Sequence, residues 1–297
     1  MFTAHLVTRP ARVASIVLAV LLGGLAGCSN GGSADAGSPP SIDDVSSFAL
    51  ALGVDPLNTA ALDRLGHYDL VVIDGASSAG KVAALQRRGA RVLGYLSVGT
   101  VEPYRPWYNE ARQNGWLLDR WPDWDEWYVD VRAAGFRDLL VAEGERQVSS
   151  AGFDGLFLDN TDMVAEHQPQ AKAMVTLVAA LDKMLGPDHL LFAQNGDTTV
   201  GAIADHLDGW NREDVSYTYD FGTTSYQPVS PADGRSARRT LRQLASRGLI
   251  VAATDYTEAG DKSAATDAVK AACSARALPF VSNIDLSRIP NQPARCR

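Results

Sequence analysis

Histidines and the common cofactor signatures are scarce in this sequence, and each scarcity excludes a class of function. The chain of 297 residues holds five histidines, and none stands in an H-E-x-x-H motif or another paired spacing typical of zinc sites. There is no G-x-G-x-x-G after the first predicted strand, no Walker motif and no G-x-S-x-G nucleophile elbow. The "DNTD" at 159–162 lacks the glycine and the distal glutamate of a calcium loop. We therefore expect neither a metal nor a cofactor.

Basic residues are also few. Lys and Arg number 27 against 35 Asp and Glu, and removal of residues 1–27 would take away two arginines, leaving 25 minus 35, or −10. A domain this acidic is not expected to bind nucleic acid. The acidity suits a cationic ligand, although solubility explains it equally well.

The N-terminal segment predicts export. A basic start precedes the apolar run "VASIVLAVLL" (13–22), which is too short to span a bilayer. "LAGC" then resembles the lipobox of bacterial lipoproteins, which implies a signal peptide over 1–27 and a lipid on Cys28. An ordinary signal peptide with a chance cysteine is the alternative. Residues 28–47, rich in Gly, Ser and Pro, predict a flexible tether before a folded domain over 48–297. We expect the protein on the outer face of the bacterial cell membrane, held by its lipid anchor only.

Only two other cysteines are present, Cys273 and Cys296. Export makes a disulfide between them chemically permissible. Sequence spacing cannot supply the geometry that a disulfide requires, so both the bonded and the free state stay open.

Short β-rich apolar runs alternate with helical stretches over the whole domain. The predicted strands are 48–53, 68–75, 91–99, 153–160, 189–196, 207–214, 249–256 and 278–285. The predicted helices are 79–89, 135–152, 169–186, 236–248 and 261–277, and 100–130 is expected to be a long loop. Eight alternating strands favour a single-domain α/β fold of the (β/α)8 TIM-barrel type over an open doubly wound sheet.

Polar side chains follow seven of the eight predicted strands. Any one of them is adequately explained as a helix cap or a turn residue. In a barrel, however, all these strand ends lie on one face, where barrel enzymes carry their active sites. The loop 103–130 adds five of the six tryptophans, most of them expected to be structural and one or two to face a ligand. Carboxylate chemistry is therefore the best-supported reaction class.

The motifs "YLSVGTVEPYR", "GFDGLFLDN", "DGWNRED" and "VSNIDLSRI" together resemble glycoside hydrolase family 114, the endo-α-1,4-polygalactosaminidase-like proteins. The resemblance covers nearly all of 48–290. It implies a (β/α)8 barrel and cleavage of galactosamine-containing polysaccharide, a cationic amino-sugar polymer that an acidic cleft would attract.

By position, the catalytic pair that the resemblance implies falls on Asp159 and Glu213. Asp159 is expected to act as nucleophile or base and Glu213 as general acid, as glycoside cleavage requires. The segment before Glu213 is more polar than the family pattern, so Asp214 stays as an alternative acid. The expected substrate-binding residues are Asp74, Tyr95, Glu102, Arg105, Asp130, Asp162, Asn195, Asp255 and Tyr256. Arg105 is expected to pair with an internal carboxylate rather than with sugar.

The alternative function is a carbohydrate-binding surface lipoprotein on the same fold that has lost catalysis. Fold does not separate it from the enzyme. The presence of both carboxylates favours the enzyme. Retention or inversion, and endo or exo action, stay open.

Overall fold

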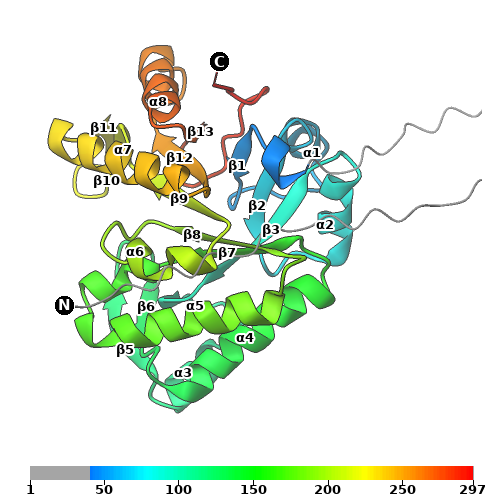
Figure 1. The fold of residues 1–297 in the computed structure, drawn as a ribbon, viewed down its shortest axis with the longest axis vertical. Coiled ribbons are helices and arrows are strands. Elements are labelled where there is room, and N and C mark those ends of the chain that lie inside the picture. Colours follow the sequence, from blue (N-terminus) through cyan, green and yellow to red (C-terminus); the bar gives the residue numbers. More distant parts are fainter. Residues whose placement is uncertain (1–40, 297) are drawn as a thin grey trace, which may run out of the picture. The chain divides into compact units, whose positions relative to one another are not determined.

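The computed structural model describes residues 41–296, so the predicted signal peptide, Cys28 and most of the expected tether lie outside the described residues. Eight parallel strands form one sheet in chain order, as Figure 1 shows. They are β1 (Phe48–Leu50), β2 (Leu70–Asp74), β3 (Arg91–Ser97), β7 (Gly155–Asp159), β8 (Leu190–Gln194), β9 (Gly209–Glu213), β12 (Ile250–Tyr256) and β13 (Leu278–Ser282). The first and last strands lie next to each other, so the sheet curls into the nearly closed barrel that the sequence predicted.

Helices connect the strands on the outside of the barrel. They are α1 (Thr59–Leu65), α2 (Ala79–Gln86), α4 (Ala134–Ser149), α5 (Ala171–Leu185), α6 (Val200–Ile203), α7 (Pro231–Ser246) and α8 (Lys262–Ser274), with short 3-10 turns at Ile42–Asp44, Thr161–Ala165, Gln168–Gln170 and Ala204–His206. Figure 1 shows α4 and α5 side by side along β7 and β8. In α5 the buried side chains from Met174 to Leu185 recur at helical spacing, and Gly186 ends the helix at a φ of 65° that favours glycine.

Aromatic side chains fill the inside of the barrel. Phe48, Phe157, Phe192 and Phe280 are all buried. The ring of Phe48 stacks on Phe157 at 6.2 Å between centroids and meets Phe280 edge-on at 6.3 Å. Because side chains alternate along a strand, every second residue of each strand joins this core and the next one joins the layer under the helices.

Two insertions depart from the simple barrel. Residues 100–130, predicted as a loop, instead form β4 (Thr100–Val101), α3 (Tyr108–Gln113), β5 (Leu117–Trp121) and β6 (Glu126–Val129), with the strands in an antiparallel sheet. A second antiparallel hairpin, β10 (Tyr217–Asp220) and β11 (Ser225–Pro228), follows β9. The first was missed because its strands carry many charged and aromatic residues and lack an apolar run.

The barrel closes tightly at one glycine. Gly53, just after β1, donates its amide to the Leu286 carbonyl at 3.3 Å. A Cβ atom at Gly53 would lie 2.1 Å from the Asp285 carbonyl oxygen, so no larger residue fits between these two loops without a shift.

On the face opposite the strand carboxyl ends, both ends of the described chain meet Asp69. Its Oδ2 accepts hydrogen bonds from the Ser46 amide and hydroxyl at 2.9 and 2.8 Å, and pairs with Arg295 at 3.0 Å. The structure joins Cys273 to Cys296 by a disulfide, one of the two states that the sequence left open. The C-terminal segment is therefore fixed to the barrel near the point where the chain enters β1.

Among residues 41–296, no helix has both the length and the apolar character needed to cross a membrane.

Candidate active site

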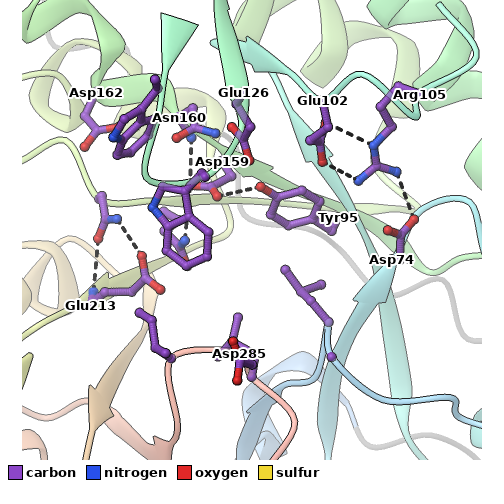
Figure 2. Close-up of a pocket in the computed structure, with 18 of the residues that line it drawn as sticks. Asp74, Tyr95, Glu102, Arg105, Glu126, Asp159, Asn160, Asp162, Glu213 and Asp285 are labelled. Carbon is purple, nitrogen blue, oxygen red and sulfur yellow. Dashed lines mark hydrogen bonds and ion pairs between the residues drawn. The ribbon is translucent and has the colours of Figure 1, made fainter. Parts of the chain in front are cut away.

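A pocket of about 360 Å³ opens at the carboxyl ends of the strands, as Figure 2 shows, and its size suits a small ligand or a sugar unit. Seven of its lining residues carry a carboxyl group and one carries a guanidinium. These are Asp74, Glu102, Glu126, Asp159, Asp162, Glu213 and Asp285, with Arg105. The acidic mouth expected from the strand ends therefore exists.

Asp159 is the last residue of β7 and lies at the base of the pocket. Its Oδ2 accepts from the Tyr95 hydroxyl at 2.7 Å, and its Oδ1 accepts from the Asn160 amide at 2.7 Å and from Gln194 Nε2 at 3.1 Å. Asn160 holds a φ of 59°, a left-handed conformation that asparagine tolerates better than most residues and that turns the chain off the strand. The carboxylate that the sequence placed at the end of an apolar strand is thus fixed by three donors.

The Gln194 amide belongs to a chain of hydrogen bonds that crosses the barrel. Its Oε1 accepts from Asn211 Nδ2 at 2.8 Å, and Asn211 Oδ1 accepts from the Thr254 hydroxyl at 3.0 Å. Gln194, Asn211 and Thr254 are all buried. Each of the three side chains therefore finds a hydrogen-bond partner on a neighbouring strand. These bonds fix the Gln194 side chain, which in turn donates to Asp159.

Glu213 ends β9 and lines the same pocket. Asn195 holds it from two sides, since Asn195 Nδ2 donates to Glu213 Oε2 at 2.8 Å and Asn195 Oδ1 accepts from the Glu213 amide at 3.0 Å. The Tyr256 hydroxyl donates to the other carboxyl oxygen. Asn195 and Tyr256, both predicted as substrate-binding residues, thus contact a predicted catalytic group.

The surroundings of the two carboxyl groups change their pKa values to different extents. Burial raises the pKa of Glu213 to about 8, and the charges of Asp159 and Asp214 add to the rise, although hydrogen bonds from Tyr256 and Asn195 oppose it. Burial also raises the pKa of Asp159, but hydrogen bonds from Tyr95, Asn160 and Gln194 oppose it. Because two nearby carboxylates resist ionising together, we take Glu213 as the group that keeps its proton and Asp159 as the one that is charged.

Asp214 does not share this environment. It follows β9 with a φ of 55°, its amide donates to the Thr254 carbonyl at 3.0 Å, and it is absent from the pocket lining. Of the two adjacent acids that the sequence left open, the pocket therefore contains Glu213.

Arg105 lies buried between two carboxylates, as expected. It donates to both oxygens of Glu102 at 3.1 and 2.8 Å and to Asp74 at 3.0 Å. The three residues come from β2 and from the segment after β4, so the ion pairs connect the insertion to the barrel wall. All three also line the pocket.

Asp162, on the turn after β7, also lines the pocket, and burial raises its pKa to about 6. Two predicted residues do not reach it. Asp130 forms an ion pair with Arg132 at 2.7 Å at the end of β6. Asp255 is buried behind β12, where its Oδ1 accepts from two backbone amides at 2.6 and 2.8 Å. Neither residue therefore belongs to the pocket lining. For Asp255 the reason is alternation along β12, which turns Tyr256 inward and Asp255 outward.

Sequence reasoning missed several lining residues on the insertion. Trp121 at the end of β5, Trp124 in the turn that follows, and Glu126 at the start of β6 all line the pocket. Trp124 also meets Phe221 of the second hairpin edge-on at 5.1 Å. The sequence analysis expected one or two tryptophans of this loop to face a ligand without choosing among them, and nothing in the sequence singled out Glu126.

No group of three or more His, Cys, Asp or Glu side chains within the described part of the chain is arranged to hold a metal ion.

Comparisons with known proteins agree with the barrel fold. An uncharacterized protein of Deinococcus radiodurans is 27% identical over 247 residues, which cover 76% of this chain and 77% of that protein. The glycoside hydrolase domain of PelA from Pseudomonas aeruginosa has a similar fold, with a TM-score of 0.71 at 22% identity over 82% of this chain and 97% of that one. Ega3 of Aspergillus fumigatus, solved in complex with galactosamine, follows with a TM-score of 0.63 at 17% identity over 87% and 97%. The model of glycoside-hydrolase family GH114 matches residues 32–294, and this chain belongs to that family.

Proposed function

We propose that this glycoside hydrolase cleaves α-1,4-linked galactosamine-containing polysaccharide, with Asp159 as nucleophile or base and Glu213 as general acid. The observation that carries the proposal is the pair itself. Two carboxyl groups from β7 and β9 face one pocket, and their surroundings favour a charged Asp159 and a protonated Glu213. Glycoside cleavage requires that division of roles.

The lining supports a cationic substrate. Even with Glu213 protonated, six other carboxyl groups against one guanidinium give the pocket a negative potential, which attracts unacetylated amino sugars. The aromatic rings of Trp121 and Trp124 provide flat apolar surface beside those charges, which suits the C–H face of a sugar ring. The galactosamine in the Ega3 structure is consistent with this chemistry.

The test is release of reducing ends from partly deacetylated α-1,4-galactosaminogalactan. Asp159→Asn and Glu213→Gln should each lower the rate by about 100- to 10,000-fold, the usual contribution of a general acid or base. Asp214→Asn is the matched control and should keep activity, because Asp214 lies outside the pocket lining. If Asp214→Asn abolishes cleavage while Glu213→Gln does not, the acid is misassigned. If the wild type binds such polymers and never cleaves them, the carbohydrate-binding alternative replaces the enzyme.

We also propose that Cys28 is lipidated and holds the protein on the outer face of the cell membrane. The support is the "LAGC" sequence at 25–28. Labelling cells with a tagged fatty acid should mark the wild type but not Cys28→Ser, and only the wild type should sediment with membranes. Equal labelling of both would contradict the anchor.

A further inference from the structure

Glu126 is the one carboxyl group that the β5–β6 turn brings into the pocket. It begins β6, immediately after a turn in which Asp125 has a φ of 54°. Trp121 and Trp124 of the same turn line the pocket with it. Figure 2 shows Glu126 on the same side of the pocket as Asn160 and Asp159. A charged group and two aromatic rings are therefore presented by six consecutive residues.

No cation of the described residues forms an ion pair with Glu126, and Arg105 acts on it only through its charge at a distance. Glu126 Oε2 accepts from the Thr100 hydroxyl at 2.5 Å. Arg105, the guanidinium of the lining, is committed to Glu102 and Asp74. Burial raises the pKa of Glu126 to about 7, and the charges of Glu102 and Asp159 add to the rise, while the hydrogen bond from Thr100 and the charge of Arg105 oppose it. A cation placed beside Glu126 would relieve this unfavourable arrangement.

The position of Glu126 is fixed before any ligand arrives. Thr100 Oγ1, which donates to Glu126, accepts from the side-chain Nδ2 of Asn160 at 2.8 Å. The backbone amide of Asn160 in turn donates to Asp159. Thr100 also shares a hydrogen bond of 2.7 Å with Ser97 at the end of β3. A carboxylate held at a set place relative to the reacting centre can select one substituent of the sugar bound there.

We propose that Glu126 binds the ammonium group of an unacetylated amino sugar and so makes the enzyme prefer deacetylated over N-acetylated units. The proposal rests on the proposed function and names the residue that sets the substrate preference. An ammonium ion supplies both the missing positive charge and donors for the free lone pairs of the carboxylate. An N-acetyl group carries no charge and cannot replace it.

The experiment compares two polymers made from one preparation: deacetylated α-1,4-linked polygalactosamine, and the same material after chemical N-acetylation. In Glu126→Gln, kcat/KM on the deacetylated polymer should fall about 10- to 100-fold, the value of a charge-assisted hydrogen bond. On the acetylated polymer it should change less than about threefold, because glutamine can still accept from Thr100. The ratio of the two values is the readout, since general damage to Asp159 would lower both alike.

Two further variants complete the test. Glu126→Asp keeps the charge and should keep most of the preference. Asp123→Asn is the matched control, because Asp123 is an exposed carboxylate of the same turn that does not line the pocket, and it should leave the ratio unchanged. An unchanged ratio in Glu126→Gln, or the same shift in Asp123→Asn, overturns the proposal.

Failure of the proposed function is separately visible. If the wild type cleaves neither polymer, calorimetry with galactosamine and N-acetylgalactosamine still reports on Glu126. Preferential binding of galactosamine that is lost in Glu126→Gln supports the assignment, and equal binding of both sugars, or a preference unaffected by the substitution, refutes it.

Discussion

Tyr95 and Tyr256 give a direct test of which carboxyl group carries the proton. Each hydroxyl donates to one member of the pair, Tyr95 to Asp159 and Tyr256 to Glu213. Burial keeps the pKa of both tyrosines well above 10, so both stay neutral donors throughout the working range. Replacing either by phenylalanine removes one donor and leaves the ring in place. Because the hydrogen bond stabilises the charged carboxylate more than the acid, each substitution should raise the pKa of its partner.

The magnitude follows from two kinds of hydrogen bond. One to a charged group contributes about 1.5–3 kcal/mol and one between neutral groups about 0.5–1.5 kcal/mol. The charged form therefore loses roughly 1–1.5 kcal/mol more than the protonated form, and at about 1.36 kcal/mol per unit the pKa rises by about one. Tyr256→Phe should move the pKa of Glu213 from about 8 to roughly 9.

The assay is the pH profile of kcat/KM, whose limbs report the free enzyme's essential base and acid. The protonated form of Glu213 is lost as the pH rises through its pKa, so Tyr256→Phe should move the basic limb of the profile to higher pH by about one unit. A charged Asp159 is lost as the pH falls, so Tyr95→Phe should shift the acidic limb upward instead. Each variant is compared with the wild type, so that titration of Glu126 and Asp162 contributes equally to both profiles.

The control is Tyr68→Phe, which removes a buried hydroxyl without a hydrogen-bond partner in the structure and should leave both limbs in place. If Tyr256→Phe moves the acidic limb and Tyr95→Phe the basic one, the two roles are reversed. If neither substitution moves a limb, these carboxyl groups do not govern the rate, and the reasoning is refuted.

Three stability predictions follow from groups around the barrel. Arg105→Met leaves Glu102 buried without its cation. A urea titration should show a free energy of unfolding lower by about 3–5 kcal/mol. A loss under about 1 kcal/mol would mean that water replaces the guanidinium. Replacing Cys273 and Cys296 by serine opens a loop with a sequence separation of 23 and should cost about 3.5 kcal/mol, seen as a lower melting temperature with kcat/KM at 25 °C unchanged. Asp255→Ala leaves two part-buried backbone amides, those of Ser216 and Tyr217, without their acceptor and should cost about 2–4 kcal/mol by the same titration. A neutral result would contradict the structural role assigned to Asp255.

The barrel was predictable because its strands are short apolar runs at regular spacing, and the eight runs match the eight strands. Asp159 could be found because it ends an apolar run, "GLFLD", within the motif that resembles the family. Asp255 was misplaced because the sequence marks the end of a strand but not which of two adjacent residues turns inward. The same ambiguity between Glu213 and Asp214 was resolved only by the φ of Asp214 and by the position of Glu213 in the pocket.

Glu126 was not predictable for a different reason. Its strand, "EWYV", is only four residues long, and it pairs with segments that themselves lack an apolar pattern. The insertion is held instead by ion pairs such as Arg105 with Asp74 and by stacked rings such as Trp121 on Tyr128, with 5.6 Å between centroids. Such contacts depend on which residues the fold brings together, so a periodic pattern in the sequence does not predict them.

The cluster around Asp69 has a consequence for how the enzyme meets a polymer. Ser46 enters the barrel at the amino ends of the strands, whereas Asp159 and Glu213 lie at the carboxyl ends. Under the proposed anchor at Cys28, the point at which the barrel is attached is therefore at the end away from the pocket. Attachment at that end keeps the mouth of the pocket clear of the attachment point, so under the proposed function a long polymer can cross the pocket without passing the attached end.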